Sequence, residues 1–496
     1  MFKPALFTTK SKSTIKATGL SSLLTVDIMD RVTDKAGLGY YTPEQLAQAL
    51  AVSAGFALVV LGALRLGWVL QIVPRSATEA YATATCLKLI ISQLPAFLGL
   101  QGISTKGSSF LVLADVLRHL GEVSVDAAFG FAVMLFLAII ALLCTALATR
   151  YPAQRRLWNF VSTLRFPIVI GMSILISWLT HREDYGGPFQ VVGLIEPGFL
   201  RAHFPTLPDA EEIGYLCTEL PAIVLSMVVS QVALVQKMAT TNGYAVNNSQ
   251  ELVALGVVNI FGPPIGGYLT MGSFSSSIIL SMAGSRSQLA GVFAALMVVM
   301  ALYLLMGVFA YTPLASLAGL VTYSMFANLP RPKALYKNWQ LSPIDSLIWT
   351  ASVAMGLVYT LEWSLYIGTI AKWLFSWALS VRKPKAQVSN PGVLVYRFNS
   401  NFCFYNQAHH LASVYDQYKK KSPAVHAIVF DFREIEHLDL ESAQGLSGLR
   451  LALDSNTECH IANAKYFWLR RTLVGAGFDT FHDCLQDAVD AAMKSA

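Results

Sequence analysis

Long apolar segments separated by short polar loops dominate the chain up to residue 381. A run of about 18 apolar residues or more is long enough to cross roughly 30 Å of hydrocarbon. The repeated runs therefore predict a polytopic α-helical membrane protein. The predicted spans cover residues 46–70, 80–100, 125–148, 162–180, 216–236, 251–269, 287–310, 313–328, 343–361 and 363–381.

Two further helical stretches, predicted over residues 17–29 and 274–283, are too short to cross a bilayer. Lipid cannot satisfy the backbone groups that are free at the ends of such a half-helix, so these ends must lie in protein or in a watery cavity. In secondary transporters, paired half-helices point to the substrate site, because their N-terminal amides and dipoles attract an anion. The pair therefore indicates an anion-binding site.

The second half-helix begins in an unusually polar stretch, GGYLTMGSFSSSIIL. Gly272 permits a sharp turn, and Ser273 or Ser275 can cap the helix and leave neighbouring amides free for an anion. Glycines and serines also allow helices to pack closely in membranes. The stretch alone is compatible with a neutral anion site and with simple close packing.

Composition and charge agree with the membrane prediction. The 496 residues are 54% hydrophobic and 13% charged, and the mean hydropathy of +0.51 is too high for an ordinary soluble enzyme. The net charge of +6 comes from basic loops that share one side if the spans alternate. The positive-inside rule makes that side, with the N-terminus and the C-terminal part, cytoplasmic, so nucleic-acid binding is not expected.

The apolar pattern gives way to a soluble region near the C-terminus. Residues 382–390 form a basic linker that contains a proline. Residues 391–496 alternate apolar strands, such as GVLVYRF and HAIVFDF, with helical stretches. This α/β pattern lacks catalytic spacing, so we expect a binding module beside a membrane domain over residues 1–381. The predicted helices of this module cover residues 440–454, 466–475 and 483–494.

Catalytic and metal-binding motifs do not stand out in the sequence. The six cysteines are scattered without metal-ligand spacing. A Ser/His/Asp set and a glycine-rich phosphate loop are also missing. We therefore expect that the protein is not an enzyme, has no catalytic residues and binds neither a metal ion nor another cofactor.

Several separate motifs are similar to one family. The stretch NNSQELVALGVVNIFGPPIGGYLTMGSFSSSIILSMAGSRSQLAGV, residues 247–292, resembles the signature region of the SulP sulfate permeases. Residues 65–94 and 338–353 resemble two other spans of that family. The C-terminal part resembles the STAS domain of such permeases over residues 391–410 and 425–446. Because the resemblance covers nearly the whole chain, the chain is identified as a fungal-type member.

The resemblance implies a fold of inverted repeats, with a sulfate-like anion between the N-termini of two half-helices. All but the first two spans of the family can be matched, so an incomplete first repeat is expected. The cytoplasmic α/β region is expected to be the STAS domain. The expected anion contacts are Gly272, Ser273, Phe274, Ser275 and Ser276 in the second half-helix, with Lys16 and Thr18 before the first.

Three positions depart from the family pattern. Ser276 replaces an arginine, and a neutral hydroxyl should hold a divalent anion less well than a guanidinium. Lys16 lies where the family has a helix-starting segment with proline, and it could supply positive charge. Ser230 and Gln231 replace the glutamate and histidine of proton-coupled members, so exchange or uniport is expected rather than proton symport.

A loop of the C-terminal region is a candidate regulatory site. Stand-alone STAS proteins carry a phosphorylated serine in a loop that corresponds to Asp439, Glu441 and Ser442 here, with Glu441 at the acceptor position. Glu441 can mimic a permanent phosphate charge, or it can be an ordinary carboxylate at a helix N-terminus. Both interpretations remain open at this point.

The leading hypothesis is a secondary transporter of sulfate or a related inorganic anion, multi-pass in the plasma membrane. The alternative is a transport-inactive membrane paralog whose STAS domain acts as a scaffold or regulator. Beside the anion and the lipid bilayer, the expected partners are a second copy of the chain and a cytoplasmic protein that binds the STAS domain. No nucleic acid is expected.

Overall fold

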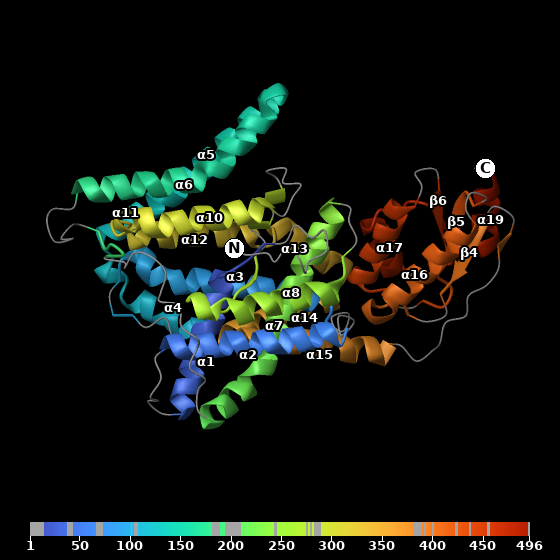
Figure 1. Cartoon of the computed structure of the whole chain (residues 1–496). Helices are drawn as coiled ribbons and strands as arrows, with labels where there is room; N and C mark the ends of the chain where they lie inside the picture. The colour runs from blue at the N-terminus through green and yellow to red at the C-terminus, as the bar shows by residue number, and fades with distance from the viewer. Residues whose placement is uncertain are drawn as a thin grey trace. The chain divides into compact units, whose positions relative to one another are not determined.

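The computed structural model describes most of the chain. The described residues are 14–36, 43–65, 73–100, 102–103, 108–180, 189–193, 210–242, 246–273, 276–277, 280–281, 289–379, 389–390, 393–398, 401–421, 425–435, 438–453 and 457–494. Their contacts divide the chain into two compact units (Figure 1). The first unit contains Met1–Leu70, Ala82–Leu329 and Gly356–Glu362, and the second contains Gln71–Tyr81, Pro330–Met355 and Trp363–Ala496.

The first unit is built from helices, as predicted. Within the described residues, four helices are long and apolar enough to cross a membrane: Pro43–Ala63, Ser76–Leu98, Val125–Arg150 and Phe160–Thr180. The helices are α1 (Gly19–Ala36), α2 (Pro43–Ala63), α3 (Arg75–Leu98), α4 (Ser109–Arg118), α5 (Val125–Arg150), α6 (Arg155–Thr180), α7 (Ala210–Asn242), α8 (Asn248–Phe261), α10 (Leu289–Leu304), α11 (Met306–Phe309) and α12 (Leu314–Asn328).

Several boundaries differ from the predicted spans. Helix α8 ends at Phe261 instead of residue 269, because two prolines follow and form a 3-10 turn, Pro263–Ile265. Helix α1 reaches Ala36 and so extends beyond the predicted half-helix. Helix α4 was not predicted from the hydropathy pattern, since it is too short for a span.

Glycines bring two helices of the first unit into close contact. A Cβ atom on Gly55 of α2 would lie 2.8 Å from the carbonyl oxygen of Gly256 on α8, and one on Gly256 would lie 2.6 Å from that of Gly55. Such distances exclude any larger residue. Small residues at this crossing allow van der Waals packing between backbones, which stabilises helix pairs where no hydrophobic effect acts.

A second packed group contains α5, α6 and α12. Val133, Leu137 and Val169 form its buried centre. The buried hydroxyl of Ser316 on α12 donates a hydrogen bond to that of Ser173 on α6, at 2.9 Å. Apolar packing and an internally satisfied hydroxyl pair thus join the three helices.

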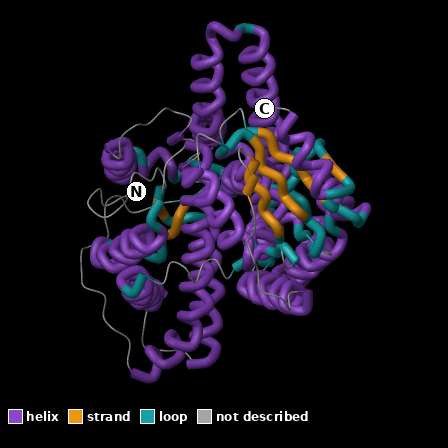
Figure 2. The backbone as a smooth tube through the Cα atoms, turned by 90° about the vertical axis from the view of Figure 1, so that its right-hand side faces the viewer, coloured by secondary structure: helices purple, strands orange, loops and turns teal. Residues whose placement is uncertain are grey.

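The second unit contains α13 (Pro332–Leu341), most of α14 (Pro343–Val358), most of α15 (Leu361–Leu379) and a five-stranded sheet. The sheet order is β3-β4-β5-β6-β7, in which β4 to β7 are parallel and β3 is antiparallel to β4 (Figure 2). The predicted linker, residues 382–390, lies mostly outside the described residues. Its last two residues form β3, and the domain boundary stays a prediction.

Helices connect the parallel strands, as the α/β pattern predicts. Ala488, Val489 and Ala492 of α19 pack against one apolar group of the sheet, while the larger aromatic core includes Phe398, Phe430 and residues of α16, α17 and α18. The strands are β3 (Ser389–Asn390), β4 (Val393–Arg397), β5 (Ala427–Asp431), β6 (Glu458–Ala462) and β7 (Phe481–His482), and the helices are α16 (Phe404–Lys421), α17 (Leu440–Ala452), α18 (Phe467–Gly475) and α19 (Leu485–Lys494).

A buried histidine in β6 should make this domain sensitive to acid. Burial lowers the pKa of His460, and the neighbouring His482 adds to this, against an opposing effect of Glu458. The folded state therefore binds protons less readily than the unfolded state, and the free energy of unfolding falls as the pH drops below about 6.5. In the full chain, amide protection factors over β6, in which the intrinsic pH dependence of exchange is divided out, should fall between pH 7 and pH 5, and His460→Gln should flatten this dependence. An unchanged pH dependence in that variant would contradict the assignment.

Candidate functional site

Two short strands bring the starts of the half-helices together. Strand β1 (Ile15–Lys16) and strand β2 (Met271–Gly272) are antiparallel, with Ile15 opposite Gly272 and Lys16 opposite Met271. Figure 2 shows this pair as two short strands. The amide of Ser273 also donates to the carbonyl of Thr14, at 2.9 Å. Two segments far apart in the sequence thus pair just before their helices, and because the strands are antiparallel the two helices begin at opposite ends of the strand pair.

The N-terminus of α1 is capped by hydroxyl groups of its own first turn. The amide of Thr18 donates to Oγ of Ser21 at 2.8 Å, and the amide of Ser21 donates to Oγ1 of Thr18 at 3.1 Å. This reciprocal arrangement is a capping box with a serine in the place of the usual glutamate. The hydroxyl of Ser22 lies 2.8 Å from the hydroxyl of Tyr268, which precedes β2.

The second half-helix has a similar arrangement of hydroxyls. Oγ of Ser273 donates to Oγ of Ser276 at 3.3 Å and accepts a long hydrogen bond of 3.5 Å from the amide of Ser276. Phe274 and Ser275 lie outside the described residues. Ser277, which sequence reasoning missed, is buried and accepts a hydrogen bond of 2.8 Å from the amide of Thr14. It therefore fastens the second half-helix to β1.

Gly272 lies where no side chain has room. A Cβ atom there would lie 2.7 Å from Cδ2 of Leu234 on α7 and closer still to Oε1 of Gln231. Nε2 of Gln231 donates to the carboxylate of Glu251 at 3.4 Å, and Glu251 is fully buried. The predicted coupling positions of α7 therefore do have a carboxyl group nearby. Sequence reasoning missed it because α8 supplies it.

A buried asparagine holds the backbone of the residue that precedes β2. Asn259 of α8 donates through Nδ2 to the carbonyls of Leu255 at 2.9 Å and of Thr270 at 3.0 Å. Its Oδ1 accepts from the amide of Thr270 at 2.8 Å. The side chain thus pairs with the backbone as a neighbouring strand would. It is a positioning residue, and although it lies in the stretch that resembles the signature region, sequence reasoning assigned it no role.

Comparison with known proteins identifies the group to which this chain is related. A family model described as "Sulfate permease family" matches residues 2–352. The chain belongs to the sulfate permease family. This is a family of transporters, not of enzymes, and the apolar helices of the first unit agree with an integral membrane protein.

Individual relatives of the permease are distant. "Sulfate permease 2" of Neurospora crassa is 27% identical over 95% of this chain and 69% of that protein. "Probable sulfate permease C869.05c" of Schizosaccharomyces pombe is also 27% identical, over 95% of this chain and 65% of that protein. The permease thus spans about two thirds of the length of these relatives.

Solved structures support the fold. The murine anion transporter Slc26a9 in the inward-facing state matches with a TM-score of 0.63 at 19% identity, over 98% of this chain and 83% of that chain. The predicted class, a polytopic helical permease with an α/β domain, is therefore confirmed. The parallel C-terminal sheet fits a STAS-like domain.

Lys16 and the three residues of the predicted regulatory loop differ in how far their side chains are buried. Lys16 is partly buried in β1, two residues before Thr18. Asp439 and Ser442 are buried. Asp439 caps α17, since its Oδ1 accepts a hydrogen bond of 2.8 Å from the amide of Ser442. Of the three loop residues, Glu441 is the one with partial exposure. A regulatory role of the loop stays a prediction.

Asp439 also contacts a lysine of α15. Nζ of Lys372 lies 3.1 Å from the carboxylate of Asp439 and forms a second ion pair with Asp345, at the start of α14. Only 1% of the Lys372 side chain is exposed. Nearby in the second unit, the hydroxyl of Thr472 on α18 donates to the carbonyl of Leu341 on α13, at 3.2 Å. These contacts fasten the STAS-like domain of the permease to α13, α14 and α15.

Within the described ranges, the permease contains no group of three or more His, Cys, Asp or Glu residues placed to bind a metal ion. The cysteines that the structure describes there are free thiols: Cys86, Cys144, Cys403, Cys459 and Cys484.

Proposed function

We propose that this permease is a secondary transporter of sulfate or a related inorganic anion. The anion is held between the N-termini of the two half-helices. The antiparallel pairing of β1 with β2 carries the proposal, because it joins the segments that lead into the two hydroxyl-rich helix starts. The proposed contacts are Gly272, Ser273, Phe274, Ser275, Ser276, Lys16 and Thr18.

Helix starts of this kind can bind an oxyanion without a fixed positive charge. Backbone amides and hydroxyls donate hydrogen bonds, and the helix dipole favours negative charge. The hydroxyl of Thr18 donates to that of Ser21 at 3.4 Å, and the hydroxyl of Ser273 donates to that of Ser276 at 3.3 Å. An arriving anion exchanges these contacts for charge-assisted ones, which are stronger.

The neutral second half-helix suggests modest affinity for sulfate. Ser276 offers one hydroxyl where an arginine would offer a bidentate charged partner. Lys16 is the cation nearest in sequence to the start of the first half-helix and is proposed to compensate part of the anion charge. With Ser230 and Gln231 at the coupling positions, we propose exchange or uniport as the transport mode.

Location and partners follow from the same proposal. We place the permease in the plasma membrane, with the N-terminus and the STAS-like domain in the cytoplasm, on the basis of the basic loops. A homodimer and a cytoplasmic protein that binds the STAS-like domain are the proposed partners.

Uptake of radiolabelled sulfate tests the proposal, in cells that lack their own sulfate permeases. The native chain is compared with Ser276→Arg at matched membrane expression. We expect saturable uptake by the native chain and a KM about tenfold lower for Ser276→Arg, since a charged hydrogen bond contributes about 1.5–3 kcal/mol. No saturable uptake by either protein would contradict transport and favour the scaffold or regulator.

A further inference from the structure

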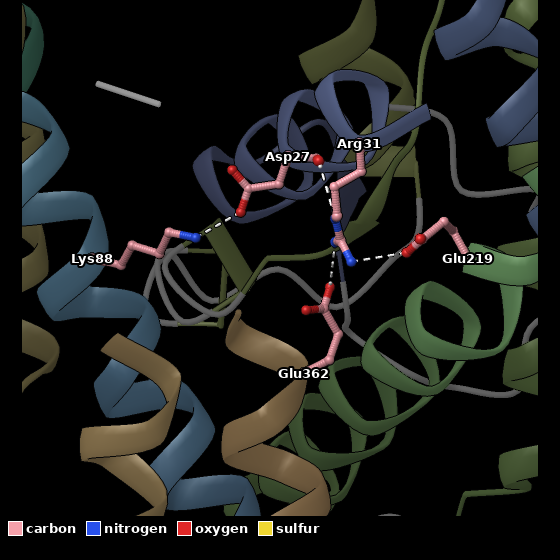
Figure 3. A network of polar contacts seen from close by, with 5 residues as sticks. All are labelled: Asp27, Arg31, Lys88, Glu219 and Glu362. Carbon is pink, nitrogen blue, oxygen red and sulfur yellow. Dashed lines mark hydrogen bonds and ion pairs between the residues drawn. The ribbon is translucent and has the colours of Figure 1, made fainter. Parts of the chain in front are cut away.

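Helix α1 carries two charged residues that face other charged side chains inside the first unit (Figure 3). Asp27 and Arg31 are one helical turn apart, and Nε of Arg31 donates to the carbonyl of Asp27 at 3.2 Å. The carboxylate of Asp27 points toward Lys88, and the guanidinium of Arg31 points toward two glutamates. Ionisable residues inside a membrane domain are costly to desolvate, so they are by default candidates for a functional role.

Each charge on α1 meets the opposite charge on another helix. Nζ of Lys88 on α3 lies 2.6 Å from Oδ2 of Asp27, and the Lys88 side chain is 9% exposed. Nη1 of Arg31 lies 2.8 Å from Oε2 of Glu219 on α7. Nη2 of Arg31 lies 3.5 Å from Oε1 of Glu362, in the first turn of α15, whose side chain is 4% exposed.

The helices of the first unit pack in two groups, and the pair of Asp27 with Lys88 connects them. The anion-site group comprises α1, α2, α7, α8, β1 and β2, which pack on one another. The supporting group comprises α5, α6 and α12, together with α3. Helix α3 joins it through Phe97, whose ring lies 4.8 Å from that of Phe131 on α5. Phe97 also lies 3.6 Å from the Cβ position of Gly319 on α12.

Between α1 and α3, a glycine faces a leucine beside the anion site, and the contact further along is charged. A Cβ atom on Gly19, in the first turn of α1, would lie an ordinary 3.6 Å from Leu89 of α3. The ion pair between Asp27 and Lys88 follows two turns later. An interface of this kind slides more readily than interdigitated apolar packing, once its ion pairs have opened.

We propose that the ion pairs of Asp27 with Lys88 and of Arg31 with Glu362 form a latch on α1. The latch holds the anion-site group against its neighbours in the described conformation, and it opens when that group shifts during transport. Asp27 lies nine residues beyond Thr18, or about 14 Å along the helix, so α1 transmits the shift rigidly to the anion site. The inference rests on the proposed transport function for its purpose, but the latch can be tested without it.

The test removes the attraction without leaving a lone buried charge. In the full chain, Asp27→Asn is combined with Lys88→Gln, which keeps two polar side chains. The reversed pair, Asp27→Lys with Lys88→Asp, restores the attraction. A control neutralises the exposed ion pair of α4, with Asp115→Asn and Arg118→Gln. Each protein is purified and reconstituted, and amide hydrogen exchange over α1 is measured.

We expect exchange over α1 to be about tenfold faster in the neutral pair, and close to native in the reversed pair and the control. At saturating sulfate, turnover of the neutral pair should rise several-fold while the Kd for sulfate changes less than about twofold, because the latch contacts no anion. Native exchange rates over α1 in the neutral pair would overturn the latch. Absence of sulfate flux from the native chain would overturn the proposed function instead, and the exchange rates would still decide on the latch.

Discussion

Replacing Gly272 with alanine should abolish sulfate uptake. The added Cβ atom would lie within 3.0 Å of side-chain atoms of Leu234 and Gln231. Cβ atoms in proteins essentially never come that close to another heavy atom. Gln231 cannot easily turn away, because it is fully buried and hydrogen-bonded to Glu251. Strand β2 must therefore move off α7, and the start of the second half-helix moves with it. A displacement of about 1 Å at a site that positions its ligand can cost about 100-fold in rate.

The measurement is uptake of radiolabelled sulfate at matched membrane expression. Gly291→Ala on α10 is the control, because its Cβ atom would meet nothing within 4 Å, and it should transport at the native rate. Native uptake by Gly272→Ala would mean that β2 does not lie against α7 during transport.

Replacing Lys372 with methionine should destabilise the second unit strongly. Methionine has nearly the length of lysine but no charge, so Asp345 and Asp439 lose the cation between them. Both aspartates are buried. Removing one partner of a buried ion pair typically costs about 3–5 kcal/mol, because an uncompensated charge stays behind. We expect earlier thermal unfolding of the C-terminal domain in the full chain and faster proteolysis there.

A matched control is Lys419→Met on α16, an exposed lysine, which should leave the melting temperature unchanged. A second variant combines Lys372→Met with Asp345→Asn and Asp439→Asn. It removes all three charges and should regain most of the stability, since a neutral set carries no desolvated charge. If Lys372→Met alone unfolds at the native temperature, the ion pairs do not stabilise the domain.

The spans could be predicted from the sequence, because apolar length determines which segments cross a membrane. Helices α2, α12 and α14 begin and end within a few residues of the predicted spans, except that α2 ends at Ala63 and not at residue 70. The start of the first half-helix was predicted to within two residues, whereas the predicted start of the second, residue 274, lies outside the described residues. Their pairing through β1 and β2 was not predicted, because hydropathy carries no information on contacts between distant segments.

The side chains that fasten the site were missed for the same reason. Asn259, Ser277 and Glu251 act through partners in other elements, and each looks ordinary in its own helix. The regulatory loop shows the opposite case. The resemblance indicated the function of its residues, but not that Lys372 of α15 meets Asp439 and helps to bury the loop.

The most direct test of the account is sulfate exchange by the purified permease in proteoliposomes, loaded with unlabelled sulfate and supplied with radiolabelled sulfate outside. The account predicts saturable uptake that depends on internal sulfate, falls about 100-fold in Gly272→Ala and shows a lower KM in Ser276→Arg. Equal, non-saturable leakage from liposomes with the native chain, with Gly272→Ala and with no protein would contradict it.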